Sequence, residues 1–227
     1  MTRPAKRAPV RRAAAARAAT RRPARAATGF ANVLKDSLLE GAALPLALLI
    51  RHRQAIERMA RMVADTLARG RTILLCGNGG SAAEAQHLAA ELVGRYRRDR
   101  AALPAIALTT DTSILTAVGN DYGFARVFAR QVEGLGRRGD LLVALTTSGR
   151  SPNVLEAVAA ARARGLRVIG MTGIEGKAFA RRCDAALVVP SRSTPRIQEM
   201  HLLVGHLLCE AAEAAAPAPG RRKGSRP

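Results

Sequence analysis

The 227-residue sequence contains no tryptophan, and aromatic residues make up only 3% of it. The core must therefore be built mainly from Ala, Leu, Val and Ile, and 48% apolar residues is enough for one sizeable domain. The three cysteines, Cys76, Cys183 and Cys209, lie far apart and form no C-x-x-C pair. This scarcity argues against a disulfide framework or a cysteine-based zinc site, and it predicts a reducing, cytoplasmic location.

Long apolar runs are missing as well. A membrane span needs about 18–20 consecutive apolar residues. The longest apolar run of this chain covers only residues 42–50, and Pro45 interrupts it. We therefore expect no membrane association.

Both ends of the chain lack acidic residues and are strongly basic. Residues 1–28 hold nine Lys or Arg and residues 217–227 hold four, so the tails account for most of the net charge of +20. Their Ala/Arg/Pro composition cannot bury a core, which predicts disordered tails around a single domain at 29–216. The tails are either solvated extensions or arms that bind nucleic acid nonspecifically. The N-terminal tail is also Arg-rich and acid-free like a transit peptide, although it has little Ser or Thr.

Between the tails, strand-like apolar runs alternate with helical segments. We expect strands at 72–76, 105–108, 141–145, 167–171 and 186–189, and helices at 81–94, 111–118, 124–135, 152–164, 177–181 and 194–215. An N-terminal helical region at 30–69 should be kinked or divided at Pro45. The strands are continuously apolar, as in a parallel sheet buried on both faces. This order predicts an α/β fold with an open, doubly wound parallel sheet sandwiched by helices.

A glycine turn follows the first strand. Residues 77–81 read GNGGS, and glycines before a helix let backbone N–H groups approach a ligand closely. With Ala82 the spacing also satisfies the dinucleotide pattern G-x-G-x-x-A. That pattern requires an acidic residue about 20 positions further on. Asp111 lies 34 positions beyond Gly77, so a nicotinamide site is the weaker interpretation.

A second turn, after the strand 141–145, is rich in hydroxyl groups. Residues 146–152 read TTSGRSP and precede a helix. Four hydroxyls together with the free N–H groups of a helix start can bind a phosphate monoester. A simple N-cap would need Ser151 alone. We therefore predict a phosphate site here, and the polar glycine turn on a neighbouring strand indicates a phosphorylated sugar or polyol.

Two histidine-containing helices provide candidates for acid–base or metal chemistry. His87 and Glu91 are four residues apart and share one helix face, which permits either metal chelation or an ordinary surface pair. In the last helix, His206 falls inside the apolar run 202–208, as either a core histidine or a site residue. Gln198 lies eight residues before His206 on the same helix and can lean toward the same cleft.

The combination of these motifs resembles a known family. GNGGSAAEAQHLAAE at 77–91, GRY at 94–96, GND at 119–121, TTSGRS at 146–151 and RIQEMH…GH at 196–206 resemble the sugar isomerase (SIS) domain family. Within it they are most similar to the phosphoheptose isomerases, over roughly residues 33–212. The resemblance implies a flavodoxin-like SIS fold and a homotetramer with active sites at subunit interfaces. In this chain the phosphate loop begins Thr-Thr-Ser where the family commonly has Ser-Thr-Ser, and Arg150 replaces the usual Asn.

The resemblance also implies an activity. It is the isomerisation of D-sedoheptulose 7-phosphate to D-glycero-D-manno-heptose 7-phosphate, the first step of nucleotide-activated heptose biosynthesis, as used for lipopolysaccharide. Glu91 and His206 would be the acid–base pair. The implied ligands of one zinc ion per subunit are His87, Glu91, Gln198 and His206. The implied substrate-binding residues are Asn78, Gly79, Gly80, Ser81, Glu91, Asn120, Asp121, Thr146, Thr147, Ser148, Ser151 and Gln198.

A non-catalytic relative offers an alternative. Some SIS-domain proteins bind a bacterial replication initiator, and they share the RIQEMH motif at 196–201. The initiator-binding member lacks the glutamate and the late histidine. Because Glu91 and His206 are both present here, the resemblance favours the enzyme.

Overall fold

The computed structural model of this protein describes residues 24–216. The chain divides into two units, the first ending at Ser37 and the second beginning at Leu38. The tails predicted at 1–28 and 217–227 therefore lie almost wholly outside the described residues. Helix α1 (Ala24–Ala68) begins inside the predicted N-terminal tail.

The N-terminal helical region is not divided at Pro45. Helix α1 continues through Pro45, although a proline removes one helical N–H donor. Leu44 and Leu48, on either side of it, are 5% and 2% exposed and belong to the core. Their packing holds this turn of the helix in place despite the lost hydrogen bond.

All five predicted strands are present and form one parallel sheet. They are β1 (Ile73–Cys76), β2 (Ala105–Ala107), β3 (Leu141–Thr146), β4 (Arg167–Gly173) and β5 (Ala185–Val189). The strand order is β2-β1-β3-β4-β5 and every neighbouring pair is parallel. This order is that of flavodoxin-like doubly wound sheets, in which the direction of winding reverses between β1 and β3.

The helices also follow the prediction closely. They are α2 (Gly80–Val93), α3 (Thr112–Tyr122), α4 (Ala129–Leu135), α5 (Pro152–Ala163), α6 (Lys177–Ala180) and α7 (Thr194–Ala215). The helix expected at 124–135 is instead a 3-10 turn, η1 (Phe124–Arg126), followed by α4. Between them, Val127 and Phe128 are buried in the core. None of the helices in the described part of the chain is long and apolar enough to cross a membrane.

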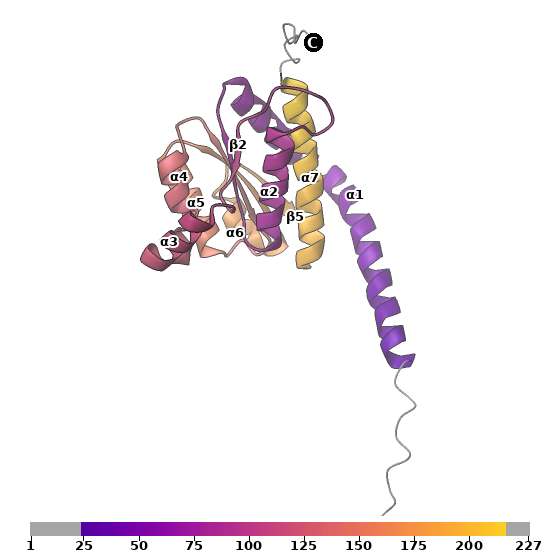
Figure 1. Cartoon of the computed structure of the whole chain (residues 1–227). Coiled ribbons are helices and arrows are strands. Elements are labelled where there is room, and N and C mark those ends of the chain that lie inside the picture. Colours follow the sequence, from indigo (N-terminus) through magenta and orange to yellow (C-terminus); the bar gives the residue numbers. More distant parts are fainter. Residues whose placement is uncertain (1–23, 217–227) are drawn as a thin grey trace, which may run out of the picture. The chain divides into compact units, whose positions relative to one another are not determined.

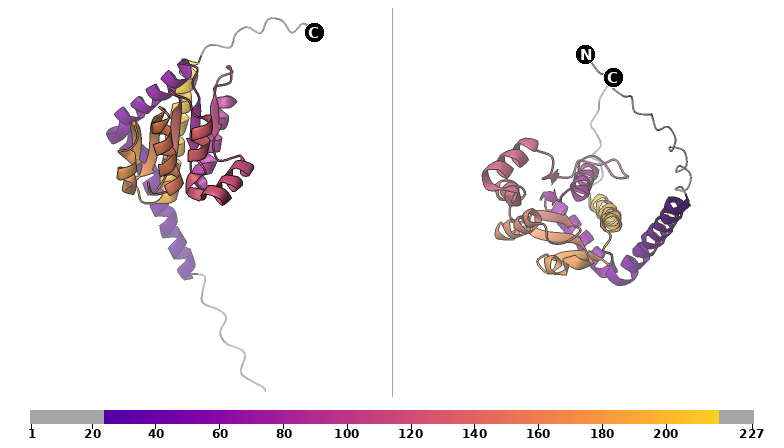
Figure 2. Two further views of the ribbon diagram at one scale, coloured as in Figure 1. Left: turned by 90° about the vertical axis from the view of Figure 1, so that its left-hand side faces the viewer. Right: turned by 90° about the horizontal axis from the view of Figure 1, so that it is seen from below.

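Two apolar layers bury the two faces of the sheet. Ile73 and Leu75 of β1 pack with residues of α1, α2 and α7, whereas Leu74 and Cys76 pack with residues of α4 and α5. Alternate side chains of a strand point to opposite faces, so both sets must be apolar. Figure 1 shows α2 and α7 side by side and α4 and α5 at the opposite side of the sheet, and Figure 2 shows the same layers from two further directions.

Candidate active site

The two predicted ligand-binding turns lie next to each other. They follow β1 and β3, which are neighbours with Cys76 paired to Ala144. The Asn78 side chain of the glycine turn exchanges two hydrogen bonds of 2.8 Å with Asn153, in the first turn of α5. Asn153 is 2% exposed, so this amide pair is a buried link between the two turns. The site is therefore at the switch point of the sheet, where doubly wound folds bind their ligands.

The glycine turn has the conformation that its sequence requires. Gly79 has φ of +55°, a left-handed conformation that side chains with a Cβ rarely adopt. A Cβ on Gly80 would collide with the side-chain amide of Gln198 from α7. Ser81, at the start of α2, is 3% exposed. The turn is thus close-packed against α7, and Gln198 lies directly beside it.

Three predicted site residues converge at one point between α2 and α7. The Nε2 atoms of His87 and His206 are 2.8 Å apart, although the residues are 119 positions apart in the chain. His87 Nε2 lies 3.4 Å from Glu91 Oε1. Donor atoms of His87, Glu91 and His206 all lie within 4.8 Å of one another. Two imidazoles and one carboxylate are a donor set typical of catalytic zinc.

His206 is at the edge of the core. Burial and the neighbouring His87 lower its pKa below the ordinary value, and the Glu91 carboxylate only partly opposes this shift. Neutral imidazole is the form that binds a metal or accepts a proton. The fully buried histidine of α7 is His201, whose Nδ1 lies 3.8 Å from Glu84 Oε2. His201 is therefore the core histidine of α7, whereas His206 lies beside His87 and Glu91.

The hydroxyl-rich loop does not serve as a helix cap. Ser151, at the N-cap position of α5, makes no capping hydrogen bond with its side chain. Its Oγ lies 3.3 Å from Thr146 Oγ1, which also accepts the N–H of Gly149 at 3.2 Å. The Ser148 hydroxyl accepts the N–H of Arg150 at 3.2 Å. The loop is ordered by its own hydroxyls, and its role in phosphate binding stays a prediction.

A polar hollow of about 160 Å³ opens beside this loop. Its lining consists of Thr147, Ser148, Arg150, Glu175, Ser191, Arg192, Thr194 and Ile197. Glu175 lies 3.0 Å from Arg150 and 3.8 Å from Arg192. With two arginines against one glutamate, the hollow is suited to an anion.

Asn120 and Asp121, predicted to hold the sugar, lie at the C-terminal end of α3. Both are exposed, and their side chains are hydrogen-bonded to each other at 2.8 Å. The described residues do not join this pair to the cluster of His87, Glu91 and His206. Its role in sugar binding stays a prediction.

Sequence reasoning missed three residues of the site. They are Asn153, which binds Asn78; Arg192, which lines the polar hollow; and Tyr96, whose ring is stacked on His206 at 5.5 Å and 24°. Tyr96 belongs to the GRY motif, which was a signal for the family but not for a contact with α7. The other two carried no sequence signal, because a buried amide and an exposed arginine are common in any chain.

The sequence and the fold of this chain are similar to those of known proteins. Residues 42–173 match the model of the SIS domain family. The chain is 60% identical to the phosphoheptose isomerase of Bradyrhizobium sp. (strain BTAi1) over 158 residues, which is 70% of this chain and 80% of that protein. It is 52% identical to the phosphoheptose isomerase of Nitratidesulfovibrio vulgaris over 80% of this chain and 87% of that one.

Among solved structures, the phosphoheptose isomerase of Neisseria gonorrhoeae superposes with a TM-score of 0.76 at 42% identity, over 82% of this chain and 99% of that one. The phosphoheptose isomerase from Francisella tularensis gives 0.75 at 36% identity, over 81% and 97%. The residues that match the family model include both predicted turns and helix α2.

Proposed function

This chain belongs to the SIS-domain family and, within it, to the phosphoheptose isomerases, and we propose that Glu91 and His206 are its acid–base pair. The reaction is the isomerisation of sedoheptulose 7-phosphate. The product that we assign to it is D-glycero-D-manno-heptose 7-phosphate. The alternative of a non-catalytic initiator-binding protein is set aside, because the relatives at 52–60% identity are isomerases.

The proposed mechanism is an enediol proton transfer. A base removes a proton from C1 of the ketose while the carbonyl oxygen on C2 gains one, which leaves a 1,2-enediol. A proton then returns to C2 and the hydroxyl on C1 loses its proton, so that the carbonyl is on C1. Each positioned acid–base group contributes about 10²–10⁴-fold to such a step. Glu91 and His206 supply the two groups, and neutral His206 can accept or relay a proton at neutral pH.

We propose zinc as the metal of this site. His87, Glu91 and His206 offer the donor atoms, and Gln198, which lies beside Gly80, is the proposed fourth ligand. When bound, zinc would polarise the substrate oxygens as a Lewis acid. The proximity of the three donor atoms supports this assignment. The Nε2 atoms of His87 and His206 are 2.8 Å apart. Without a metal between them, either their lone pairs face each other or the two nitrogens share one proton.

The substrate phosphate is proposed to bind at the loop 146–151. Its hydroxyls and the arginines of the adjacent polar hollow provide the donors. The glycine turn with Ser81 would then hold the sugar, together with Asn120 and Asp121. Anchoring the phosphate end holds the reacting carbons in register with Glu91 and His206.

The convergence of His87, Glu91 and His206 beside the glycine turn carries this proposal. Glu91→Gln and His206→Ala should each lower turnover of sedoheptulose 7-phosphate at least about 100-fold. Glu210→Gln, on an exposed acid one turn beyond His206, is the matched control and should retain turnover. Near-normal activity in either site variant would contradict the assignment.

A homotetramer is proposed for the assembly. Leu46, Leu49 and Ile50 of α1 are 59%, 61% and 71% exposed and share one helix face. Leu203 and Leu207 form a second exposed apolar pair on α7. Apolar surface of this kind marks protein–protein contacts. Native mass spectrometry should give four times the chain mass, and Leu49→Lys with Ile50→Lys should reduce it; a monomeric wild-type protein would contradict the proposal.

We also propose a cytoplasmic location for this protein and a binding role for its basic tails. Three free cysteines support a reducing, cytoplasmic location. Nucleic-acid binding is assigned only to the basic tails, which lie outside the described residues. Deleting residues 1–28 should then abolish any salt-dependent binding to duplex DNA, measured by fluorescence anisotropy.

A further inference from the structure

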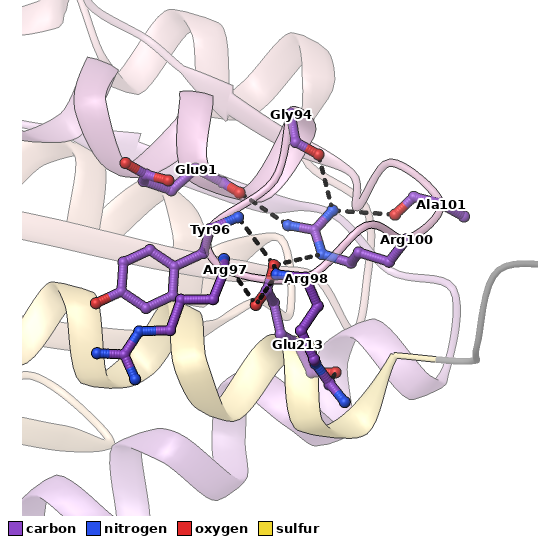
Figure 3. Close-up of polar contacts among 8 residues, drawn as sticks. All are labelled: Glu91, Gly94, Tyr96, Arg97, Arg98, Arg100, Ala101 and Glu213. Carbon is purple, nitrogen blue, oxygen red and sulfur yellow. Dashed lines mark hydrogen bonds and ion pairs between the residues drawn. The ribbon is translucent and has the colours of Figure 1, made fainter.

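A single buried carboxylate holds the segment that follows α2. Glu213 of α7 accepts the backbone N–H of Tyr96 at 2.8 Å, that of Arg97 at 3.0 Å and that of Arg98 at 3.1 Å. Figure 3 shows these donors meeting at the Glu213 carboxylate. Glu213 is 3% exposed, so the three bonds are sheltered from water. Three consecutive amides bound to one charged acceptor constrain the path of this segment strongly.

Arg100 extends the same network to the end of α2. Its Nε lies 3.4 Å from Glu213 Oε1, and both side chains are 3% exposed. The guanidinium also donates to the backbone carbonyl of Glu91 at 2.8 Å and to that of Gly94 at 3.2 Å. These carbonyls lie at the C-terminus of α2, where a helix lacks its own donors. Arg100 and Glu213 therefore tie the end of α2, which carries Glu91, to α7, which carries His206.

The charge of Glu213 is favoured where it lies. Burial by itself raises the pKa of the carboxyl, but the N–H groups of Arg97, Tyr96 and Arg98 and the Arg100 guanidinium outweigh burial. The pKa of Glu213 is consequently below its ordinary value. The network is thus intact as an ion pair at neutral pH.

The network also determines where one ring of the site lies. His206 and Glu213 are seven residues apart on α7, which places both on the same helix face. Tyr96 is the first residue held by Glu213, and its ring is stacked on the His206 imidazole at 5.5 Å. The backbone bond to Glu213 and the ring contact with His206 thus belong to one residue.

We propose that Glu213 is a positioning residue for the isomerase reaction, holding Tyr96 so that its ring orients the His206 imidazole. The inference rests on the proposed role of His206. Neither Glu213 nor Tyr96 needs to touch the substrate for this effect. Small displacements of a catalytic group are enough to cost a large share of the rate.

The direct test is Glu213→Gln, which preserves size but brings an NH₂ group among N–H donors. We expect kcat to fall about tenfold while KM changes less than twofold, because the phosphate end is untouched. Glu210→Gln is the matched control. Glu210 lies on the same helix and binds the Arg97 side chain at 2.7 Å, but it is 48% exposed. That variant should keep kcat within twofold.

Tyr96 provides a second route that leaves the buried carboxylate in place. Tyr96→Ala should reproduce the loss in kcat, and Tyr96→Phe, which retains the ring, should restore it. The double variant of Glu213→Gln and Tyr96→Ala should lose no more than either single variant, because both act through one contact. Near-normal kcat in Tyr96→Ala, or additive losses, would overturn the proposal even if Glu213→Gln fails to fold.

NMR signals of the His206 imidazole distinguish a failure of the positioning role of Glu213 from a failure of the proposed function. The NMR resonances of the His206 imidazole should shift in Glu213→Gln and in Tyr96→Ala, but not in Glu210→Gln. An active His206→Ala enzyme would overturn the role of His206 and this inference with it. An inactive His206→Ala enzyme beside a fully active Glu213→Gln enzyme would overturn only the positioning role.

Discussion

The two ends of the proposed active site, the reacting end at α2 and α7 and the phosphate end at the loop 146–151, are built in different ways. At the reacting end, Glu213 and Arg100 are 3% exposed and bind backbone groups at the end of α2 and in the segment that follows it. At the phosphate end, the side chains of Arg150 and Arg192 are 73% and 82% exposed, and they share the half-exposed Glu175. The first arrangement permits one conformation, whereas the second leaves long side chains in water.

This difference corresponds to the two tasks of the site. Proton transfer requires catalytic groups placed within a fraction of an ångström, which buried and fully bonded polar groups can provide. Capture of a phosphate requires mainly positive charge and donors, and exposed ion pairs contribute little to stability. We therefore expect changes at the reacting end to lower kcat and changes at the phosphate end to raise KM.

The largest effect is expected for the cluster between α2 and α7. His87→Ala removes one of three converging donors and should lower kcat at least about 100-fold. Bound metal, measured by inductively coupled plasma mass spectrometry, should fall in parallel. Full metal content with normal kcat would show that His87 is only a surface residue.

A smaller effect is expected at the phosphate loop. Ser148→Ala removes a hydroxyl that lines the polar hollow and should raise KM for the sugar phosphate about tenfold, the loss of a hydrogen bond to a charged group. The kcat at saturation should stay within about twofold. A loss confined to kcat would contradict the expectation that the phosphate end affects KM and the reacting end affects kcat.

Arg150 should have a still smaller effect, because its side chain is exposed. Arg150→Asn should raise KM about twofold at low salt, and the difference from wild type should vanish near 0.5 M NaCl, where exposed charges are screened. Steady-state kinetics at two salt concentrations measures this. A salt-independent effect would instead indicate a direct, desolvated contact with the phosphate.

The smallest effect at neutral pH is expected for the ionisation of Glu213. Its contribution to the free energy of unfolding should change only in acid. Glu213 has a lowered pKa in the folded protein, so its contribution to stability is present above the unfolded pKa of about 4.3 and is lost as the pH falls through the folded value. Urea unfolding from pH 7 to pH 3 should show this loss in the wild type, and the loss should be smaller in Glu213→Gln. Parallel pH curves for the two proteins would contradict a depressed pKa.

Most of the fold followed from local patterns. Strand Leu141–Thr146 is buried at every position because both faces of the sheet are covered, and its sequence is correspondingly apolar up to Leu145. Helix α7 has the predicted bounds because the signals for its start and its apolar period lie within its own residues. At Pro45 the local rule allowed either a kink or a division of the helix. The helix is not divided there, and Leu44 and Leu48 on either side of Pro45 are packed into the core.

By itself the sequence determined which chemical groups the proposed site contains: the glycine turn, the hydroxyl loop and the pair of His87 and Glu91 on one helix face. Each of these is a local arrangement, and local geometry depends on neighbours in the chain. Only the tertiary structure decided how the groups are held. The link from Asn78 to Asn153 and the three amides on Glu213 join positions 75 and about 116 residues apart. Such contacts form when buried polar groups must find partners across the packed layers, and no local pattern records which partner they find.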